Sequence, residues 1–378
     1  MSDQPVHVKK GLEGVIFDST AISKATPEKR ELIYRGYAVP DLAEQCSFEE
    51  TAYLLLRGEL PPPEKLAAFC QRERRSRCLG KALLAGMRQF PRASHPMDAV
   101  RTAVSFLGME EEFMGPDHGE EGFDKAVKLL AKIPTIIAAD YRIRNDLEII
   151  PPRDDLSIAE NFYHMCFDKA PEKEFAKALD ASLTLYAEHG FNVSTFTARV
   201  IVSSLSDMCA AVTGAIGSLK GPLHGGANEA VMHMLKEIGS PDRAHDWLRE
   251  RLQAKRKIMG FGHRLYRIGD SRVPTMTRYR NALAERTGEL RWVEISIVLE
   301  ETMISEKNIY PNLDFPAGPT YHMLGFPIDM FTPIFVMARV AGWTAHVMEQ
   351  LSDNRLVRPL GDYVGPAERP VVPLAERE

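Results

Sequence analysis

The chain has 378 residues, more than a single hydrophobic core usually organises, so we expect two packed domains or one domain with a large subdomain. Hydrophobic residues make up 44% and charged residues 26% of the chain, which excludes a disordered or fibrous protein. Lysine and arginine number 47 against 52 for aspartate and glutamate, and the net charge of -5 argues against a protein that holds nucleic acid mainly through phosphate attraction.

Cysteine usage and the N-terminal segment indicate the cellular compartment. The five cysteines are odd in number and form no CxxC pair, so the sequence predicts neither a disulfide framework nor a zinc site. The opening segment MSDQPVHVKK lacks the apolar core of a secretion signal, and the most apolar long stretch, residues 331–351, contains Arg339, His346 and Glu349. We therefore expect a cytoplasmic protein with no membrane span.

The predicted elements begin with a few short strands near the N-terminus, for which residues 15–17 and 33–37 are the candidates. Helix signals follow. Ser47 can cap a helix while Glu50 reaches back to it, and the apolar run after them ends before Gly58. This combination predicts a complete helix with both of its ends marked.

Prolines mark further helix starts. Pro62-Pro63 opens one helix, and Thr332-Pro333 opens another whose apolar positions recur at spacings of three and four, a period that a strand cannot use. Segment breaks without the length of a flexible linker fall at residues 115–122, 151–152 and 239–241. The fold class is therefore predicted to be mainly α.

Three short segments carry polar residues for which a helical core has little structural use. They are GPLHGGANE at 221–229, GFGHR at 260–264 and PNLDF at 311–315. Each is predicted to present one titratable side chain on a turn, and the glycines around the two histidines leave room for a ligand to approach closely. The candidates are His224, His263 and Asp314.

These three side chains together can carry out an enolisation. A carboxylate between Leu313 and Phe315 is expected to have a raised pKa, which suits a group that takes a proton. The carboxylate would remove a carbon-bound proton, one imidazole would stabilise the enol oxygen, and the other would polarise the carbonyl under attack. This chemistry requires no metal.

Each candidate also has a purely structural interpretation. A histidine between glycines is as often a cap or core residue as a catalyst, and NxD commonly marks a turn, so the prediction depends on all three together. Gly260-x-Gly262 matches the start of a dinucleotide fingerprint, but Leu265 stands where the third glycine belongs. The run RERRSR at 72–77 is typical of a solvated helix face, although Arg74 could face a ligand.

His95 precedes Pro96 and is predicted to start a helix, at a turn that can also line a cleft.

Six motifs, taken in order, resemble the citrate synthase family over nearly the whole chain, residues 10–373. They are YRGY at 34–37, AEHGFNVSTFTAR at 187–199, GPLHGGANEAV at 221–231, KIMGFGHRLYRIGDSR at 257–272, PNLDFPAGPTY at 311–321 and FTPIFVMARVAGW at 331–343. The resemblance implies a large helical domain, residues 1–224 and 324–378, and a small helical domain, residues 225–323, that closes on the ligands.

The resemblance also implies roles for the candidate residues. Asp314 would deprotonate the acyl group, His224 would hold the enol oxygen, and His263 would polarise the carbonyl of oxaloacetate. The implied oxaloacetate ligands, which suit a dicarboxylate because guanidinium groups bind carboxylates bidentately, are His189, Arg272, Arg339, Arg358 and, as a further position, Arg74. The implied coenzyme A segment comprises Lys257, Ile258, Met259, Gly260 and Phe261, with Arg267 as a further candidate.

In this family the residue at Arg358 reaches the neighbouring subunit, which implies an obligate homodimer. No permanently bound cofactor and no metal are expected; acyl-CoA is a co-substrate. HPMD at 95–98, GDSRVPTM at 269–276 and the ending DYVGPAERP resemble short bacterial members that include 2-methylcitrate synthases. The implied reaction condenses propionyl-CoA, and also acetyl-CoA, with oxaloacetate.

Three alternatives stay open. The chain could be a dedicated citrate synthase, a related lyase or transferase acting on another keto acid, or an inactive helical homologue with a binding or regulatory role.

Overall fold

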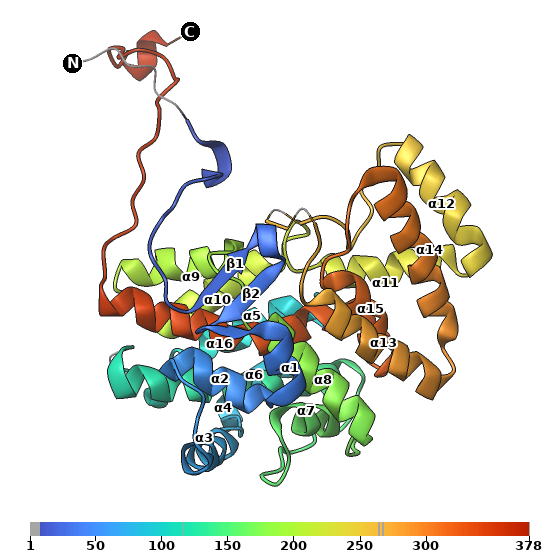
Figure 1. Cartoon of the computed structure of the whole chain (residues 1–378). Helices are drawn as coiled ribbons and strands as arrows, with labels where there is room; N and C mark the ends of the chain where they lie inside the picture. Colours follow the sequence, from blue (N-terminus) through green and yellow to red (C-terminus); the bar gives the residue numbers. More distant parts are fainter. Residues whose placement is uncertain (1–7, 116, 264, 267, 378) are drawn as a thin grey trace.

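The computed structural model describes residues 8–115, 117–263, 265–266 and 268–377, and it is mainly helical (Figure 1). Its strands form one antiparallel sheet near the N-terminus, in the order β1 (Ser23–Thr26), β2 (Glu31–Tyr34) and β3 (Tyr37–Ala38). Ser23 of β1 pairs with Tyr34 of β2, and Tyr34 pairs in turn with Tyr37 of β3.

The described residues form sixteen α-helices and five short 3-10 helices, which include η2 (Pro27–Lys29) and η4 (Ile328–Met330). In chain order the α-helices are α1 (Val39–Gln45), α2 (Phe48–Arg57), α3 (Pro63–Arg75), α4 (Lys81–Met87), α5 (Pro96–Leu107), α6 (Gly119–Arg144), α7 (Ile158–Phe167), α8 (Lys173–Tyr186), α9 (Val193–Ser203), α10 (Met208–Leu219), α11 (Ala227–Ile238), α12 (Pro241–Gln253), α13 (Val273–Thr287), α14 (Leu290–Lys307), α15 (Asp314–Met323) and α16 (Phe331–Ser352).

The strand predictions were partly wrong. Residues 15–17 lie in no strand; Ile16 is 91% exposed, and the ring of Phe17 packs against the ring of Phe196 instead of a neighbouring strand. The run 33–37 is divided between β2 and β3, because Arg35 and Gly36 adopt left-handed φ values of 49° and 94° and form the tight turn between them.

The predicted helix ends are confirmed. Ser47 caps α2 with Glu50 in a capping box, and Gly58 ends the helix with a φ of 93°. Pro63 is the first residue of α3, and His95 caps α5 by accepting a hydrogen bond from the backbone N–H of Met97 at 3.2 Å.

The run at 72–77 is not uniformly a solvated face. Arg72 and Arg75 are exposed as predicted, but Glu73 and Arg77 are buried and form an ion pair of 2.7 Å. Arg77 also donates to the carbonyl of Leu156 at 3.0 Å, so this arginine ties α3 to a distant loop. A buried pair at a spacing of four residues carries the same sequence signature as a solvated one, which explains the wrong prediction.

Helix α16 is the centre of the molecule. It packs against α6, α8, α9 and α10, and nearly all its side chains are buried, those of Arg339 and His346 included. Helices α11–α15 pack against one another on one side of this body (Figure 1). The predicted domain boundaries at 224/225 and 323/324 stay a prediction.

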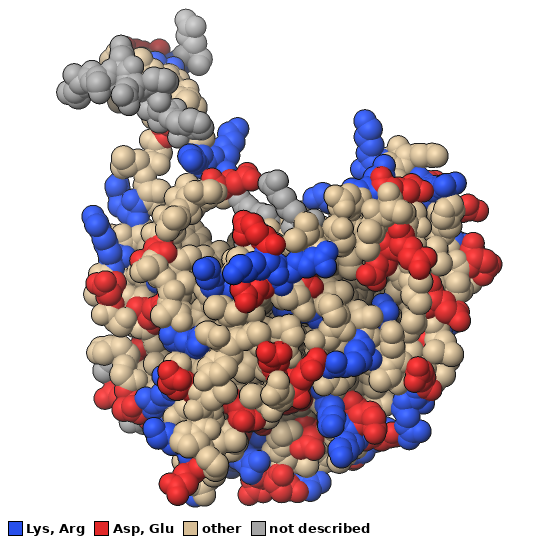
Figure 2. All heavy atoms as spheres, viewed as in Figure 1, with Lys and Arg blue, Asp and Glu red and all other residues tan. Residues whose placement is uncertain are grey.

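The segments before β1 and after α16 leave the helical body on the same side (Figure 1). Apolar side chains in the C-terminal segment are exposed, including Leu360 at 89%, Tyr363 at 77% and Val364 at 89%. Acidic and basic side chains are interspersed over the visible face (Figure 2). In the described part of the chain, no helix combines the length and apolar composition that a membrane crossing requires. The five cysteines are all free, and among them Cys78 has an exposed side chain.

Candidate active site

The end of α8 connects several of the predicted site residues. The carbonyl of Leu185 accepts a hydrogen bond from Arg272 Nη1 at 3.3 Å, and the next carbonyl, that of Tyr186, accepts one from Arg339 Nε at 2.6 Å. The hydroxyl of the same Tyr186 donates to Asp314 Oδ1 at 2.6 Å. Two arginines and one carboxylate from three distant parts of the chain are therefore held around a single turn.

His189 and His263 lie side by side next to this turn. Their ring centroids are 5.0 Å apart, and Tyr266 Oη lies 3.1 Å from His189 Nε2. His263 Nδ1 accepts hydrogen bonds from the backbone N–H groups of Leu265 at 3.1 Å and Tyr266 at 3.3 Å. The neutral His263 ring must therefore carry its proton on Nε2, which is a hydrogen-bond donor.

Both of these imidazoles are held in the neutral form. Burial, and then the charge of Arg272, lower the pKa of His263 to about 4. The same two causes lower the pKa of His189 well below its ordinary value. A neutral imidazole can donate a hydrogen bond to a carbonyl without bringing a further charge into the site.

His224 lies on the turn between α10 and α11, as predicted, and is fixed by Ser194. Its Nε2 is 2.8 Å from Ser194 Oγ and accepts from the Ser194 backbone N–H at 3.3 Å, so the ring proton belongs on Nδ1. Trp343 Nε1 donates to the same hydroxyl at 3.1 Å. Burial, and then the charge of Arg339, lower the pKa of His224 to about 3.

Asp314 is the first residue of α15 rather than a turn residue, which corrects the sequence prediction. Its neighbours Leu313 and Phe315 are buried, and burial raises the pKa of Asp314 to about 6 although the hydrogen bond from Tyr186 opposes the rise. The predicted direction of this shift is confirmed. The carboxylate is therefore ionised near neutral pH yet basic enough to accept a proton.

The two buried arginines differ in their hydrogen-bond partners. Arg272 makes a bidentate pair with Asp270, at 3.0 and 2.7 Å, and although burial disfavours its cation, Asp270 outweighs this and raises its pKa. Arg339 is 1% exposed, and burial lowers its pKa. Its Nη1 has no hydrogen-bond partner in the described part of the chain, so a carboxylate of a ligand would satisfy it.

The segment before His263 pairs with the segment before Asp314. Gly262 N donates to the carbonyl of Tyr310, and Asn312 N donates to the carbonyl of Gly260, both at 2.9 Å. These backbone bonds bring the predicted coenzyme A segment and the predicted base together.

Gly260 shows how closely these segments pack. It has a φ of 79°, and a Cβ there would lie 2.7 Å from Val231 Cγ2 and 2.9 Å from Phe315 Cβ. In the same predicted coenzyme A segment Lys257 is exposed, Ile258 is buried, and Met259 and Phe261 are half-buried. Arg267 lies outside the described residues.

Two predicted oxaloacetate ligands are not brought to this cluster within one chain. Arg74 lies on α3, which packs against α2 and α6, away from the cluster around Tyr186. Arg358 is exposed in the segment after α16 that leaves the helical body (Figure 1).

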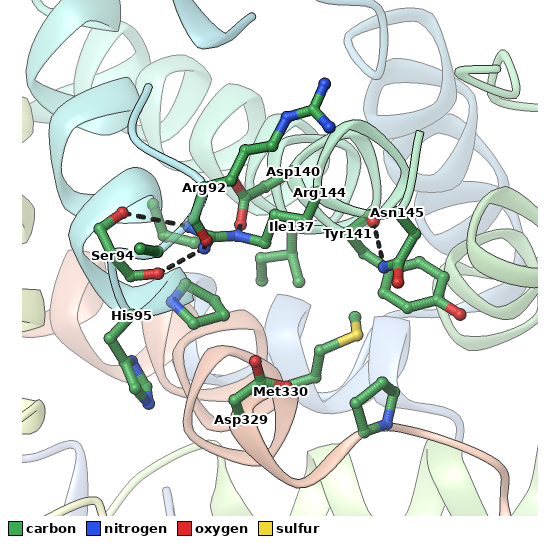
Figure 3. Close-up of a pocket in the computed structure, with 14 residues that line it drawn as sticks. Arg92, Ser94, His95, Ile137, Asp140, Tyr141, Arg144, Asn145, Asp329 and Met330 are labelled. Atoms are coloured by element: carbon green, nitrogen blue, oxygen red, sulfur yellow. Dashed lines mark hydrogen bonds and ion pairs between the residues drawn. The ribbon is translucent and has the colours of Figure 1, made fainter. Parts of the chain in front are cut away.

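A cavity of about 400 Å³ lies elsewhere, between the start of α5, the end of α6 and η4 (Figure 3). Most of its charged side chains already have partners: Arg144 pairs with Asp140, and His95 Nε2 lies 3.3 Å from Oε2 of Glu229, which is not among the lining residues. The predicted catalytic residues are not among those that line it. The candidate active site is therefore the cluster around Tyr186.

Four residues that hold the cluster together were not predicted from the sequence: Tyr186, Ser194, Tyr266 and Asp270. Three of them stand inside the quoted motifs, and Tyr186 directly precedes one. No local pattern distinguishes them, since each acts through a partner distant in the chain or through its own backbone turn. Within the described residues, no group of three or more His, Cys, Asp or Glu side chains is placed to hold a metal ion.

A mainly helical protein with neutral imidazoles, a carboxylate of raised pKa and buried arginines has the site of an acid–base enzyme for a carboxylate-bearing substrate. The family description "Citrate synthase, C-terminal domain" matches residues 11–360, and the chain belongs to the citrate synthase family.

Its relatives carry two different names. The chain is 53% identical over 369 residues to a 2-methylcitrate synthase of Mycobacterium tuberculosis, covering 97% of this chain and 93% of that protein. It is 52% identical over 365 residues to a citrate synthase of Mycolicibacterium smegmatis, covering 97% of each. A solved ternary complex of Thermoplasma acidophilum citrate synthase with carboxymethyl coenzyme A and oxaloacetate superposes with a TM-score of 0.93, at 34% identity, covering 98% of this chain and all of that one.

Proposed function

We propose that the protein condenses a short acyl-CoA with oxaloacetate and water, giving 2-methylcitrate or citrate and free coenzyme A. One observation supports this most strongly. Tyr186 binds Asp314 through its hydroxyl and Arg339 through its carbonyl, so the group suited to take a proton and a group suited to hold a carboxylate share one support. The reaction class is that of a transferase that converts an acyl group into an alkyl group.

Asp314 would act as the base. Tyr186 occupies Oδ1, which leaves Oδ2 to take the proton from the carbon next to the thioester. A pKa of about 6 makes the carboxylate a stronger base than an ordinary aspartate while keeping it ionised at neutral pH.

The two imidazoles would act as neutral hydrogen-bond donors. His224 would donate from Nδ1 to the thioester oxygen as the enol forms, and His263 would donate from Nε2 to the oxaloacetate carbonyl. The enol carbon then attacks the polarised carbonyl carbon, and the new alkoxide takes up one proton, which balances the proton that Asp314 removed. Water cleaves the thioester of the condensed product, which releases coenzyme A.

Oxaloacetate would be held by His189, Arg272 and Arg339, with the unpartnered Nη1 of Arg339 taking one carboxylate oxygen. We propose that Arg358 of a second copy completes the site. Its place in an exposed segment with exposed apolar side chains fits a segment that packs on another subunit.

Propionyl-CoA is the acyl substrate that we favour, with acetyl-CoA activity beside it. The relatives include both named activities, and one methylene separates the two substrates by only about 1 to 3 kcal/mol in a hydrophobic pocket. A dedicated citrate synthase is the second candidate.

Thiol release from propionyl-CoA and acetyl-CoA, each with oxaloacetate, tests the proposal on one preparation by comparing kcat/KM. A higher value for propionyl-CoA supports a 2-methylcitrate synthase, and a higher value for acetyl-CoA supports a citrate synthase. Absence of oxaloacetate-dependent release with either would favour an inactive homologue, and an oxaloacetate-dependent thermal shift would then report whether the ligand still binds.

A further inference from the structure

The hairpin of β1 and β2 is fixed at its base to the segment that carries His189. Ser23 Oγ donates to Glu188 Oε1 at 2.9 Å, and Gly190 N donates to Ser23 Oγ at 3.0 Å. From the second strand, Tyr34 Oη donates to the carbonyl of Glu188 at 2.8 Å. The base of the hairpin therefore moves with the turn around His189.

The tip of the same hairpin contacts the opposite side of the site through Arg30. This residue lies between η2 and β2, is exposed, and has a φ of 53°, a conformation that glycine adopts more easily than arginine. Its guanidinium carbon lies 5.2 Å from the ring centroid of Tyr310, within the range of a cation–π contact. A Cβ placed on Gly269 would lie 3.1 Å from that same carbon.

Arg30 thus touches two segments that the proposed chemistry needs. Tyr310 accepts the backbone bond from Gly262, directly before His263, and lies shortly before Asp314. Gly269 directly precedes Asp270, the partner of Arg272. In the described part of the chain Arg30 forms no ion pair, so its side chain is not committed to a carboxylate.

We propose that Arg30 is a positioning residue for the condensation. By packing on Tyr310 and Gly269, it holds the segments that carry His263 and Asp314 in register with the segment that carries His189. This inference rests on the proposed function.

The acyl-CoA side should depend on Arg30 more than the oxaloacetate side. Arg272 is buried and held independently by Asp270 and the carbonyl of Leu185, so losing Arg30 leaves it in place. The segment around Gly260, in contrast, is held to Tyr310 and Asn312 by backbone hydrogen bonds. A loosened Tyr310 therefore weakens the predicted coenzyme A segment first.

The test compares Arg30→Gly with Lys29→Ala, which removes the neighbouring exposed cation of the same turn. Glycine removes the side chain and suits the positive φ, so the melting temperature should not fall. We expect KM for the acyl-CoA to rise about two- to fivefold, the scale of one exposed cation–π contact, with a smaller change in KM for oxaloacetate. Lys29→Ala should leave both values unchanged.

A double-mutant cycle identifies the partner. Tyr310→Leu should raise KM for the acyl-CoA by a similar factor alone and add little in the Arg30→Gly background. The proposal is overturned if the two substitutions raise KM for the acyl-CoA independently, so that their factors multiply. It is also overturned if Arg30→Gly leaves this KM unchanged, or if it lowers the melting temperature and raises both KM values. Turnover of the unaltered protein is measured first: its absence would end both proposals, whereas turnover that is indifferent to Arg30 would end only this one.

Discussion

The site has two halves that are positioned by different means. His189, His224 and Arg339 form what we call the body half, and His263, Arg272 and Asp314 the loop half. The body half is held largely by partners on helices distant in the chain, as when Trp343 and Ser194 fix His224. In the loop half, His263 is held by the backbone of its own turn.

Local sequence marks some residues of each half and not others. A loop that must pack backbone against backbone needs glycines, and these mark His263 in the sequence. Arg339 in the body half carries no such mark, because its partner is an ordinary backbone carbonyl distant in the chain, whereas His224 is followed by Gly225 and Gly226 although Ser194 holds it. If the proposed roles are right, Asp314 of the loop half serves proton removal and Arg339 of the body half serves carboxylate binding, and variants at these and neighbouring residues test this assignment.

The largest effect is expected from the loop half. Asp314→Asn removes the proposed base, so kcat should fall by about 10²- to 10⁴-fold while oxaloacetate still raises the melting temperature. Steady-state thiol release and a thermal shift measure the two properties. Asp329→Asn, which alters an exposed carboxylate within η4, is the matched control and should leave kcat unchanged. Retained turnover in Asp314→Asn would contradict the mechanism.

In the body half, Arg339→Lys keeps a positive charge but loses the planar fork. We expect KM for oxaloacetate to rise about 10- to 100-fold, the scale of a hydrogen bond to a charged group, with a smaller change in KM for the acyl-CoA. Because Arg339 is buried, circular dichroism must first establish that the variant folds. An equal rise in KM for both substrates in a folded variant would contradict a specific role of Arg339 in binding oxaloacetate.

Packing in the loop half can be tested with glycines of similar φ. Gly260→Ala places a Cβ against Val231 and Phe315, so we expect about 1–3 kcal/mol of lost stability and a raised KM for the acyl-CoA. Gly288 has a φ of 75° but open space around it, so Gly288→Ala should cost only the backbone strain, about 1 kcal/mol. Urea unfolding and kinetics on both variants separate the cost of backbone strain from the cost of steric overlap. Equal losses of stability in the two variants would show that packing at Gly260 is unimportant.

The smallest effect is expected where the halves meet. Tyr186→Phe removes a hydrogen bond that favours ionised Asp314, so the pKa of Asp314 should rise further above its ordinary value. Activity requires the ionised form; the fall in rate on acidification should therefore begin at a higher pH than in the unaltered protein. At alkaline pH the rate should change only about threefold. An unchanged pH dependence of the rate would show that Tyr186 does not lower the pKa of Asp314.

Much of the fold could be predicted from local chemistry. The capping residues Ser47 and Gly58 define α2 without any tertiary information, because their hydrogen bonds lie within the helix itself. Strand pairing at residues 15–17 could not be judged locally, since a strand requires a partner that the sequence does not name. For the same reason the role of Tyr186 in connecting Asp314 and Arg339 was not predicted, because these partners lie 128 and 153 residues away in the chain.

The uneven accessibility of the cysteines decides how product formation can be monitored. Thiol-reactive dyes label any accessible thiolate, and Cys78 is exposed, whereas burial raises the pKa of Cys46 and raises that of Cys70 to about 11. Every chain therefore contributes a colour change of its own before substrate is added. Cys78→Ser would lower the background colour change of the protein itself. The native Cys78 offers an attachment point for a fluorophore.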